Sequence, residues 1–133
     1  MILTYSKDIF VEAIKNGSKV HTIREDPNRR WKPGMSIQHW RGNPRNKHQN
    51  PYCFGDGWCL GVQEIDIRRW LRPFNTIEDG FSVYIDGRFL YTEEVRQLVI
   101  NDELSIEEFR DWFVPDGSPS YVGRIIHFTE LKY

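Results

Sequence analysis

Cysteine is scarce in this chain of 133 residues, and long apolar runs are missing from it. Cys53 and Cys59 are too few for the disulfide framework of a secreted domain, so we expect two free thiols in a reducing cytosol. The sequence has no charged and then apolar leader, and no apolar stretch long enough to cross a bilayer. We therefore expect a cytoplasmic protein that has no membrane partner.

Metal-ligand spacing is also missing. A zinc site that used His39 or His48 would need a spacing such as CxxC or HxxxH, and the sequence contains neither. We therefore predict no metal and no cofactor.

An excess of charge of one sign is absent as well, because the formal net charge is -1. The distribution is uneven: residues 1–75 hold 13 Lys and Arg against 7 Asp and Glu, whereas residues 76–133 hold 5 against 12. Such asymmetry predicts a dipolar molecule whose basic side can meet an anionic partner. The alternative is that folding mixes the two halves and the asymmetry disappears.

The local patterns predict one α+β, mainly β, domain over residues 1–133. Residues 7–16 carry apolar side chains at helical spacing before Gly17, and Asp86-Gly87 is a hairpin signal. No regular strand-helix alternation is present, so we predict a small, mixed, mostly antiparallel β-barrel with about three short helices packed on it. Segments 20–24, 37–40, 58–67 and 123–131 should share one curved sheet. The other expected elements are strands at 1–5, 81–85 and 88–91, and helices at 7–16, 92–100 and 105–113.

The segment Lys19-Val20-His21-Thr22-Ile23-Arg24 places an amine, a hydroxyl and a guanidinium at a helix-to-strand junction. A threonine hydroxyl becomes a nucleophile when a neighbouring base takes its proton, and a buried lysine can be that base. Arg24 could polarise a carbonyl or pair with a phosphate. Structural roles are the alternative: Lys19 at the helix dipole, Thr22 as a strand former, and Arg24 paired with Glu25 or Asp26.

A basic segment with interspersed aromatic rings follows this motif, and its loop over residues 42–51 is long enough to suggest a functional role. Its cations could gather a phosphate-bearing ligand, and one or two exposed rings could stack on bases. Core packing of the rings is the alternative. The candidate ligand-binding or RNA-binding residues are Arg24, Arg29, Arg30, Trp31, Arg41, Arg45, Lys47 and Tyr52.

The chain resembles the ASCH family, a branch of the PUA-like superfamily of small β-barrels associated with RNA. The matching residues are Gly17, Lys19, Thr22 and Arg24, followed by residues 32–37, in which Met35 replaces the usual acidic residue. Phage and prophage proteins of this class are more similar still. They share the Arg-Gly-Asn-Pro-Arg-Asn loop at 41–46, the Asn-Asp pair at 101–102 and the Ile-Ile-His strand at 125–127.

Some members of this class are small amidohydrolases that remove the acetyl group from N(4)-acetylcytidine with a Lys-Thr-Glu triad. The resemblance implies that Lys19 and Thr22 take the first two roles and that Asp102, with Glu103 beside it, takes the acidic one. Aspartate is one methylene shorter than glutamate, and a displacement of about 1 Å can cost about a hundredfold in rate.

Two functions therefore compete. The first is a PUA-like module that binds RNA or a nucleoside or nucleotide, because binding needs only the basic segment and a cleft. The alternative is an amidohydrolase of acylated nucleosides that uses Lys19, Thr22 and Asp102. In either case Lys19, Thr22, Arg24 and Asp102 should line one cleft that is bordered by the loop over residues 42–51.

Overall fold

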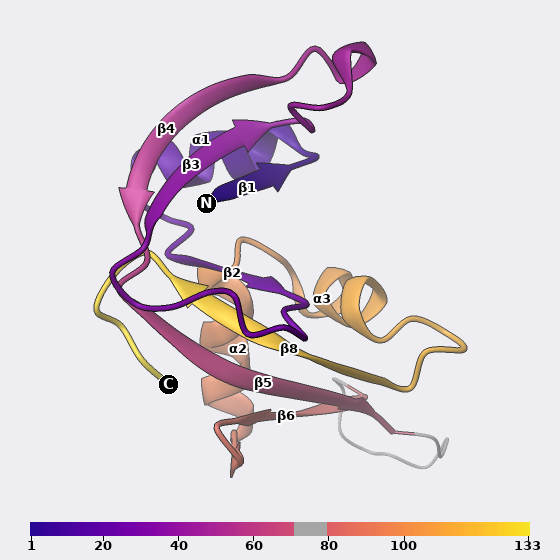
Figure 1. Cartoon of the computed structure of the whole chain (residues 1–133). Helices are drawn as coiled ribbons and strands as arrows, with labels where there is room; N and C mark the ends of the chain where they lie inside the picture. Colours follow the sequence, from indigo (N-terminus) through magenta and orange to yellow (C-terminus); the bar gives the residue numbers. More distant parts are fainter. Residues whose placement is uncertain (71–79) are drawn as a thin grey trace.

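A computed structural model of the chain describes residues 1–70 and 80–133 (Figure 1). It is a mixed α+β structure, as predicted, and the three helices occur where the sequence patterns place them. Among the described residues, no helix combines the length and the apolar character that a membrane span requires. The elements are β1 (Ile2–Tyr5), α1 (Asp8–Asn16), β2 (His21–Arg24), β3 (Ser36–Arg41), the 3-10 helix η1 (Lys47–Gln49), β4 (Tyr52–Trp58), β5 (Gly61–Arg69), β6 (Phe81–Ile85), β7 (Arg88–Phe89), α2 (Thr92–Asn101), α3 (Ile106–Phe113) and β8 (Ser120–His127).

Two sheets carry the strands of the described residues, and neither sheet closes into a barrel. The smaller sheet has the order β1-β3-β4, and the larger one has the order β2-β8-β5-β6-β7 (Figure 1). Within residues 1–70 and 80–133, all strand pairings are antiparallel except the one between β1 and β3. The prediction of one shared sheet is therefore wrong for the segment 37–40, which belongs to the smaller sheet. Segments 20–24, 58–67 and 123–131 contribute β2, β5 and β8 of the larger one.

The chain passes from one sheet to the other at two consecutive residues. The Cys59 amide donates to the Met35 carbonyl at 2.8 Å beside the smaller sheet, and the Leu60 amide donates to the His127 carbonyl at 2.9 Å beside the larger one. The predicted strand segment 58–67 is therefore the last residue of β4, Trp58, followed by the first part of β5. The missed strand β4 contains Gly55 and Gly57, which weaken a strand signal in the sequence.

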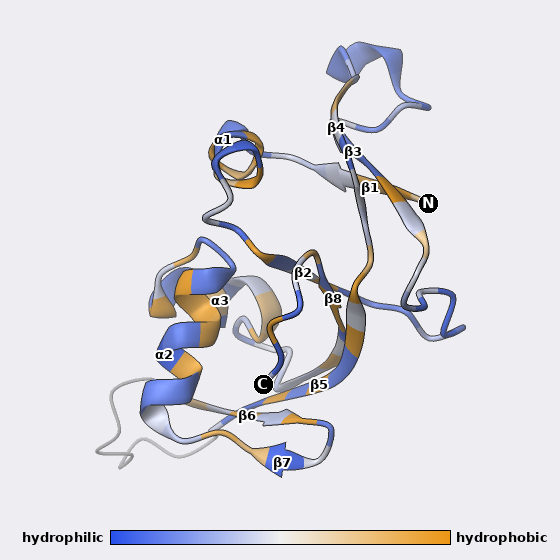
Figure 2. Cartoon of the chain, turned by 90° about the vertical axis from the view of Figure 1, so that its left-hand side faces the viewer, coloured by the Kyte–Doolittle hydropathy of each residue, from blue (hydrophilic) through white to orange (hydrophobic). Residues whose placement is uncertain are grey.

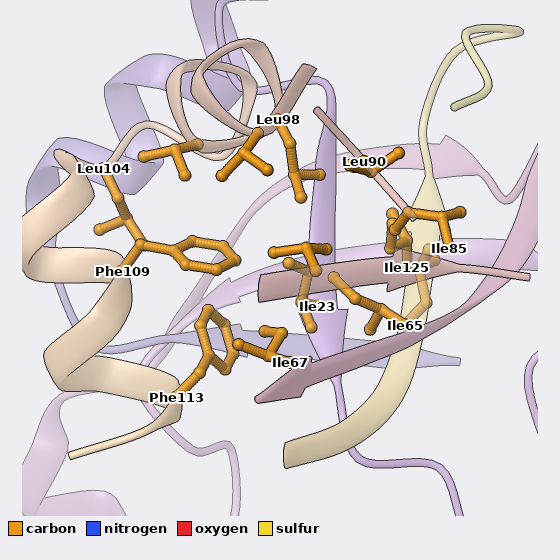
Figure 3. Close-up of a cluster of buried hydrophobic side chains, with 14 of the residues drawn as sticks. Ile23, Ile65, Ile67, Ile85, Leu90, Leu98, Leu104, Phe109, Phe113 and Ile125 are labelled. Atoms are coloured by element: carbon orange, nitrogen blue, oxygen red, sulfur yellow. The ribbon is translucent and has the colours of Figure 1, made fainter. Parts of the chain in front are cut away.

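The main core lies between the larger sheet and the helices α2 and α3 (Figures 2 and 3). Side chains alternate between buried and half-buried along β5 and β6, as expected for strands with one covered face. Helix α3 begins with a capping box, in which Ser105 and Glu108 satisfy each other's backbone amides. The buried side chains labelled in Figure 3 are Ile23, Ile65, Ile67, Ile85, Leu90, Leu98, Leu104, Phe109, Phe113 and Ile125.

Helix α1 lies beside the smaller sheet (Figure 2) and ends where the sequence predicts. Gly17 adopts a left-handed conformation with φ of 82°, and its amide donates to the Ile14 carbonyl. The Asp86-Gly87 hairpin is confirmed as well, with both residues at positive φ between β6 and β7. The end of α1 is the point from which the chain enters β2.

Candidate functional site

A cleft of about 530 Å³ contains the four residues that the sequence places in one site. Lys19, Thr22, Arg24 and Asp102 all line it, and its mouth includes Gly42, Asn43 and Gln49 from the loop over residues 42–51. The remaining walls come from β1, α1, α3 and the start of β8. The other lining residues are Thr4, Tyr5, Ser6, Phe10, Ile23, Glu25, Leu104, Trp112, Phe113 and Tyr121.

Backbone hydrogen bonds bring Lys19 and Asp102 together. The Lys19 amide donates to the Ala13 carbonyl at 3.0 Å, so the end of α1 fixes the lysine. Asp102 is the C-cap residue of α2, and its amide donates to the Leu98 carbonyl at 3.1 Å. The Val20 amide donates to the Asn101 carbonyl at 3.2 Å, which ties the two segments directly to each other.

Lys19 and Asp102 form a buried ion pair in the wall of the cleft. Lys19 Nζ lies 2.5 Å from Asp102 Oδ1 and 2.9 Å from the Asp102 carbonyl oxygen. The two side chains are only 3% and 5% exposed. The ammonium also lies 4.8 Å from the centre of the Phe10 ring. The departure from glutamate to aspartate therefore leaves the carboxylate in direct contact with the lysine.

Burial and pairing act in opposite directions on this pair. Burial lowers the pKa of Lys19, and the attraction of Asp102 opposes that effect without cancelling it. Burial alone would raise the pKa of Asp102, but Lys19 and His21 outweigh it and hold that pKa below its usual value. The site thus combines an ionised carboxylate with an amine that burial moves towards its neutral form.

Thr22 and Arg24 lie on the same face of β2, two residues apart. Arg24 Nε donates to Thr22 Oγ1 at 3.2 Å, and Arg24 Nη2 donates to the Thr4 carbonyl at 2.7 Å. The guanidinium also lies 5.3 Å from the centre of the Tyr5 ring. Burial raises the pKa of Tyr5, so this phenol stays protonated. Arg24 therefore holds a positive charge against the threonine hydroxyl.

The basic segment does not gather at the cleft. Arg29 pairs with Glu64 at 2.7 Å, and Arg41 pairs with Asp8 at 2.8 Å. Among the described residues that line the cleft, the cations are Lys19 and Arg24. The other candidates Arg30, Arg45, Lys47 and Tyr52 are exposed outside the lining of the cleft.

Trp31 is in the core, so the prediction that it stacks on a base is wrong. Its side chain is 6% exposed, and its amide donates to Asp26 Oδ2 at 3.0 Å. The same carboxylate accepts from the Arg30 amide and from Arg124 Nη1, at 2.9 and 2.8 Å. Asp26 therefore folds the loop back onto β8 and carries the ring inward. Arg24 does not take Asp26 as a partner here, since Arg124 occupies it.

The polar residues that contact Asp102 from the side opposite Lys19 were not among the candidates from the sequence. His21 is fully buried, with Nδ1 at 3.4 Å from Asp102 Oδ1 and Nε2 at 2.7 Å from the Tyr133 hydroxyl. The strand pattern correctly separates His21 from Thr22, but it does not show that a distant helix end lies against the imidazole. Only the spatial return of α2 and of the segment after β8 reveals this contact.

A second cavity, of about 490 Å³, also includes Lys19 in its lining. Phe54, Trp58 and Phe128 give it an aromatic wall, together with His39. The His39 Nδ1 atom shares a hydrogen bond of 2.8 Å with the Tyr5 hydroxyl, and burial lowers the pKa of His39 to about 4. This imidazole is therefore neutral at physiological pH.

Comparisons with protein families, with curated proteins and with solved structures found no match to this chain. The described residues also contain no group of three or more His, Cys, Asp or Glu side chains arranged to hold a metal ion.

Proposed function

We propose that the cleft binds an acylated nucleoside, or a related amide of that size, and hydrolyses its amide bond. The observation that carries this proposal is the buried contact between Lys19 and Asp102 in a cleft that Thr22 also lines. We also propose that the chain belongs to the ASCH branch of the PUA-like class. The order of helix, Lys-x-x-Thr-x-Arg strand, loop and strand supports this assignment, with the two sheets as an open form of the barrel.

A buried ion pair contributes little net stability to a protein core. Desolvation of two charges commonly cancels their attraction, so an apolar pair of similar volume is often as stable or more stable. Groups with perturbed pKa values in a cleft are typical of functional sites. The Lys19–Asp102 pair combines both features, which favours a chemical role over a purely structural one.

The residues fit a two-step acyl transfer. Lys19 acts in its deprotonated form, which burial favours over the ammonium of the ion pair, and takes the proton of the Thr22 hydroxyl while Oγ1 attacks the amide carbonyl carbon. The carbon–nitrogen bond then breaks, and the new ammonium of Lys19 gives its proton to the leaving amine. Water next attacks the acyl-threonine ester, loses a proton to Lys19, and releases the carboxylic acid as Thr22 Oγ1 regains a proton. The products are one acid and one amine from one amide and one water.

Asp102 and Arg24 have supporting electrostatic roles in these steps. The Asp102 carboxylate accepts a hydrogen bond from Lys19 and stabilises the ammonium that forms. The Arg24 Nε–H already points at Thr22 Oγ1, so it stabilises negative charge on that oxygen. The cleft volume of about 530 Å³ is in the range of small-molecule sites.

Incubation with a panel of N-acylated nucleosides and simple amides, followed by chromatography of the products, tests the proposal. We expect release of the free amine by the wild-type protein, loss of turnover in Thr22→Ala and retention of some turnover in Thr22→Ser. Thr92→Ala, at the exposed start of α2, is the matched control and should behave as the wild type. Absence of turnover with every substrate, or full activity of Thr22→Ala, would reject the hydrolase.

Binding without catalysis is the second candidate. The observation in its favour is the Arg24 guanidinium in the cleft; Arg41 and Arg45 do not line the cleft but lie beside and on the loop over residues 42–51, of which Gly42, Asn43 and Gln49 do line it. If single-stranded RNA is the ligand, its affinity should fall steeply with salt, and replacing Arg41 and Arg45 by Ala should lower the salt slope by roughly one to one and a half. An unchanged slope, or no binding at low salt, would exclude RNA.

A further inference from the structure

A series of polar groups, of which His21 is buried and Asn101 and Tyr133 are half-buried, leads to the Lys19–Asp102 pair. Asn101 Nδ2 lies 2.9 Å from the Tyr133 hydroxyl, which lies 2.7 Å from His21 Nε2. On the other side of the same imidazole, Nδ1 faces Asp102 Oδ1 at 3.4 Å, without the alignment of a hydrogen bond. This series of contacts therefore ends at the Asp102 carboxylate, which also contacts Lys19.

For an imidazole that carries one proton, these contacts favour one arrangement. The Asn101 amide nitrogen can only donate, so the Tyr133 oxygen accepts from it. The Tyr133 hydroxyl then donates its single proton to His21 Nε2. Nε2 is the acceptor, and the imidazole proton lies on Nδ1. The opposite tautomer would place an unprotonated Nδ1 lone pair 3.4 Å from the lone pairs of Asp102 Oδ1, and these repel each other.

Tyr133 is held firmly enough to fix that arrangement. Its amide donates to Gln63 Oε1 at 2.9 Å, and its carbonyl oxygen accepts from Gln63 Nε2 at 2.9 Å. Its ring lies 5.5 Å from that of His21 and 5.8 Å from that of His127, centre to centre. The hydroxyl therefore has little freedom to leave the imidazole.

We propose that His21 is a positioning residue, which holds the Asp102 carboxylate against Lys19 through an Nδ1–H tautomer that Tyr133 and Asn101 fix. The effect on turnover rests on the hydrolase proposed above, whereas the tautomer and its effect on Lys19 do not. Carboxylates and imidazoles commonly orient each other in proteins. Here His21 orients Asp102, and Asp102 contacts Lys19, which acts as the base.

Nitrogen-15 NMR of the histidine side chains tests the tautomer in the unmodified protein. We expect a proton on His21 Nδ1 and none on Nε2. A proton on Nε2 would overturn the proposal. This measurement requires no variant, so it stands even where a substitution prevents folding.

Tyr133→Phe tests whether the hydroxyl has the proposed effect. The ring and both bonds to the Gln63 side chain remain, while His21 Nε2 loses its proton donor. We expect a mixture of His21 tautomers and a changed nitrogen-15 shift of Lys19 Nζ. Tyr84→Phe is the matched control, because Tyr84 is a half-buried tyrosine on β6 that packs against Phe89, and it should change neither signal. Unchanged His21 and Lys19 signals in Tyr133→Phe would overturn the proposal.

Kinetics separate this proposal from the hydrolase itself. With a substrate in hand, Tyr133→Phe should lower kcat by about tenfold while KM stays within about twofold, similar to the loss of outer partners at other preorganised sites. If no amide is turned over by the wild type, the hydrolase fails, and the NMR signals still decide the role of His21. Normal kcat in Tyr133→Phe with an active wild type would show that His21 does not position the pair.

Discussion

Lys19 Nζ and Asp102 Oδ1 lie 2.5 Å apart although 83 residues separate them in the sequence. The lysine follows the end of α1, and the aspartate caps the end of α2. The C-terminal ends of α1 and α2 therefore meet at one buried ion pair. The properties of that pair and of its neighbours lead to the predictions below.

Removal of the carboxylate charge should destabilise the protein strongly. Asp102→Asn leaves the Lys19 ammonium buried without a counter-charge, and loss of one partner of a buried ion pair costs about 3 to 5 kcal/mol. Urea denaturation should show this decrease in the free energy of unfolding. The control Asp111→Asn removes an exposed carboxylate on α3 and should change it by about 0.5 kcal/mol or less. A small effect of Asp102→Asn would mean that water reaches the pair.

Acidification below neutral pH should destabilise the fold through two buried histidines. Burial lowers the pKa of His39 to about 4 and, with help from the nearby His21 and Lys132, that of His127 to about 3. Unfolded histidine takes up a proton near pH 6.5, so the unfolded state binds more protons between those values and stability falls as the pH falls. Each group contributes up to about 1.4 kcal/mol per pH unit in that window.

Urea titrations between pH 7 and pH 4 measure this slope. His39→Phe keeps an aromatic ring beside Phe54 and should reduce the slope by up to half. The matched control His48→Gln changes an exposed histidine of η1 and should leave it as in the wild type. The same slope in His39→Phe as in the wild type would assign the acid sensitivity to other groups.

Replacement of the guanidinium on β2 should impair chemistry more than folding. Arg24 reaches Thr22 Oγ1 and the Thr4 carbonyl with two different nitrogens, and a lysine ammonium cannot reproduce that fork. Arg24→Lys should lower kcat by about a hundredfold, the typical loss of one preorganised donor. Arg88→Lys, which alters a surface pair with Glu94, is the control. Equal activity of the two variants would remove Arg24 from the mechanism.

A side chain at Gly123 on β8 should distort β2, the strand that carries Thr22 and Arg24. A Cβ atom there would lie 2.7 Å from the Arg24 carbonyl oxygen and 2.6 Å from the Tyr121 ring, so β2 and β8 would have to separate. Gly123→Ala should therefore cost about 1 to 3 kcal/mol in the free energy of unfolding and weaken ligand binding. Gly55→Ala on β4 adds a methyl group in open space and is the control. Wild-type stability of Gly123→Ala would show that the strands adjust freely.

Local structure is predicted well from the sequence, because it depends on short-range signals. Gly17 ends α1, Ser105 and Glu108 cap α3, and the Lys19–Arg24 segment lines the cleft. The strand period of two explains why Thr22 and Arg24 share a face of β2, whereas the cleft itself depends on the order of the surrounding elements. Strand alternation likewise separates His21 from Thr22 without any knowledge of the fold.

The division into two sheets could not be predicted in the same way. The amides of Cys59 and Leu60 bond to different sheets, and nothing in their side chains records which carbonyl each amide meets. Trp31 was misplaced for a similar reason, since the Asp26 carboxylate that draws its loop inward is held by Arg124, 98 residues away. Long-range pairing therefore determined both errors.

The separation of 83 residues between Lys19 and Asp102 also sets the order in which this site can appear during synthesis. A nascent chain exposes the lysine first, and that lysine remains hydrated until α2 has left the ribosome and docked. His21 acquires its hydrogen-bond partner later still, because Tyr133 lies 112 residues downstream. The buried charge pair therefore forms late, only after α2 has docked against the end of α1.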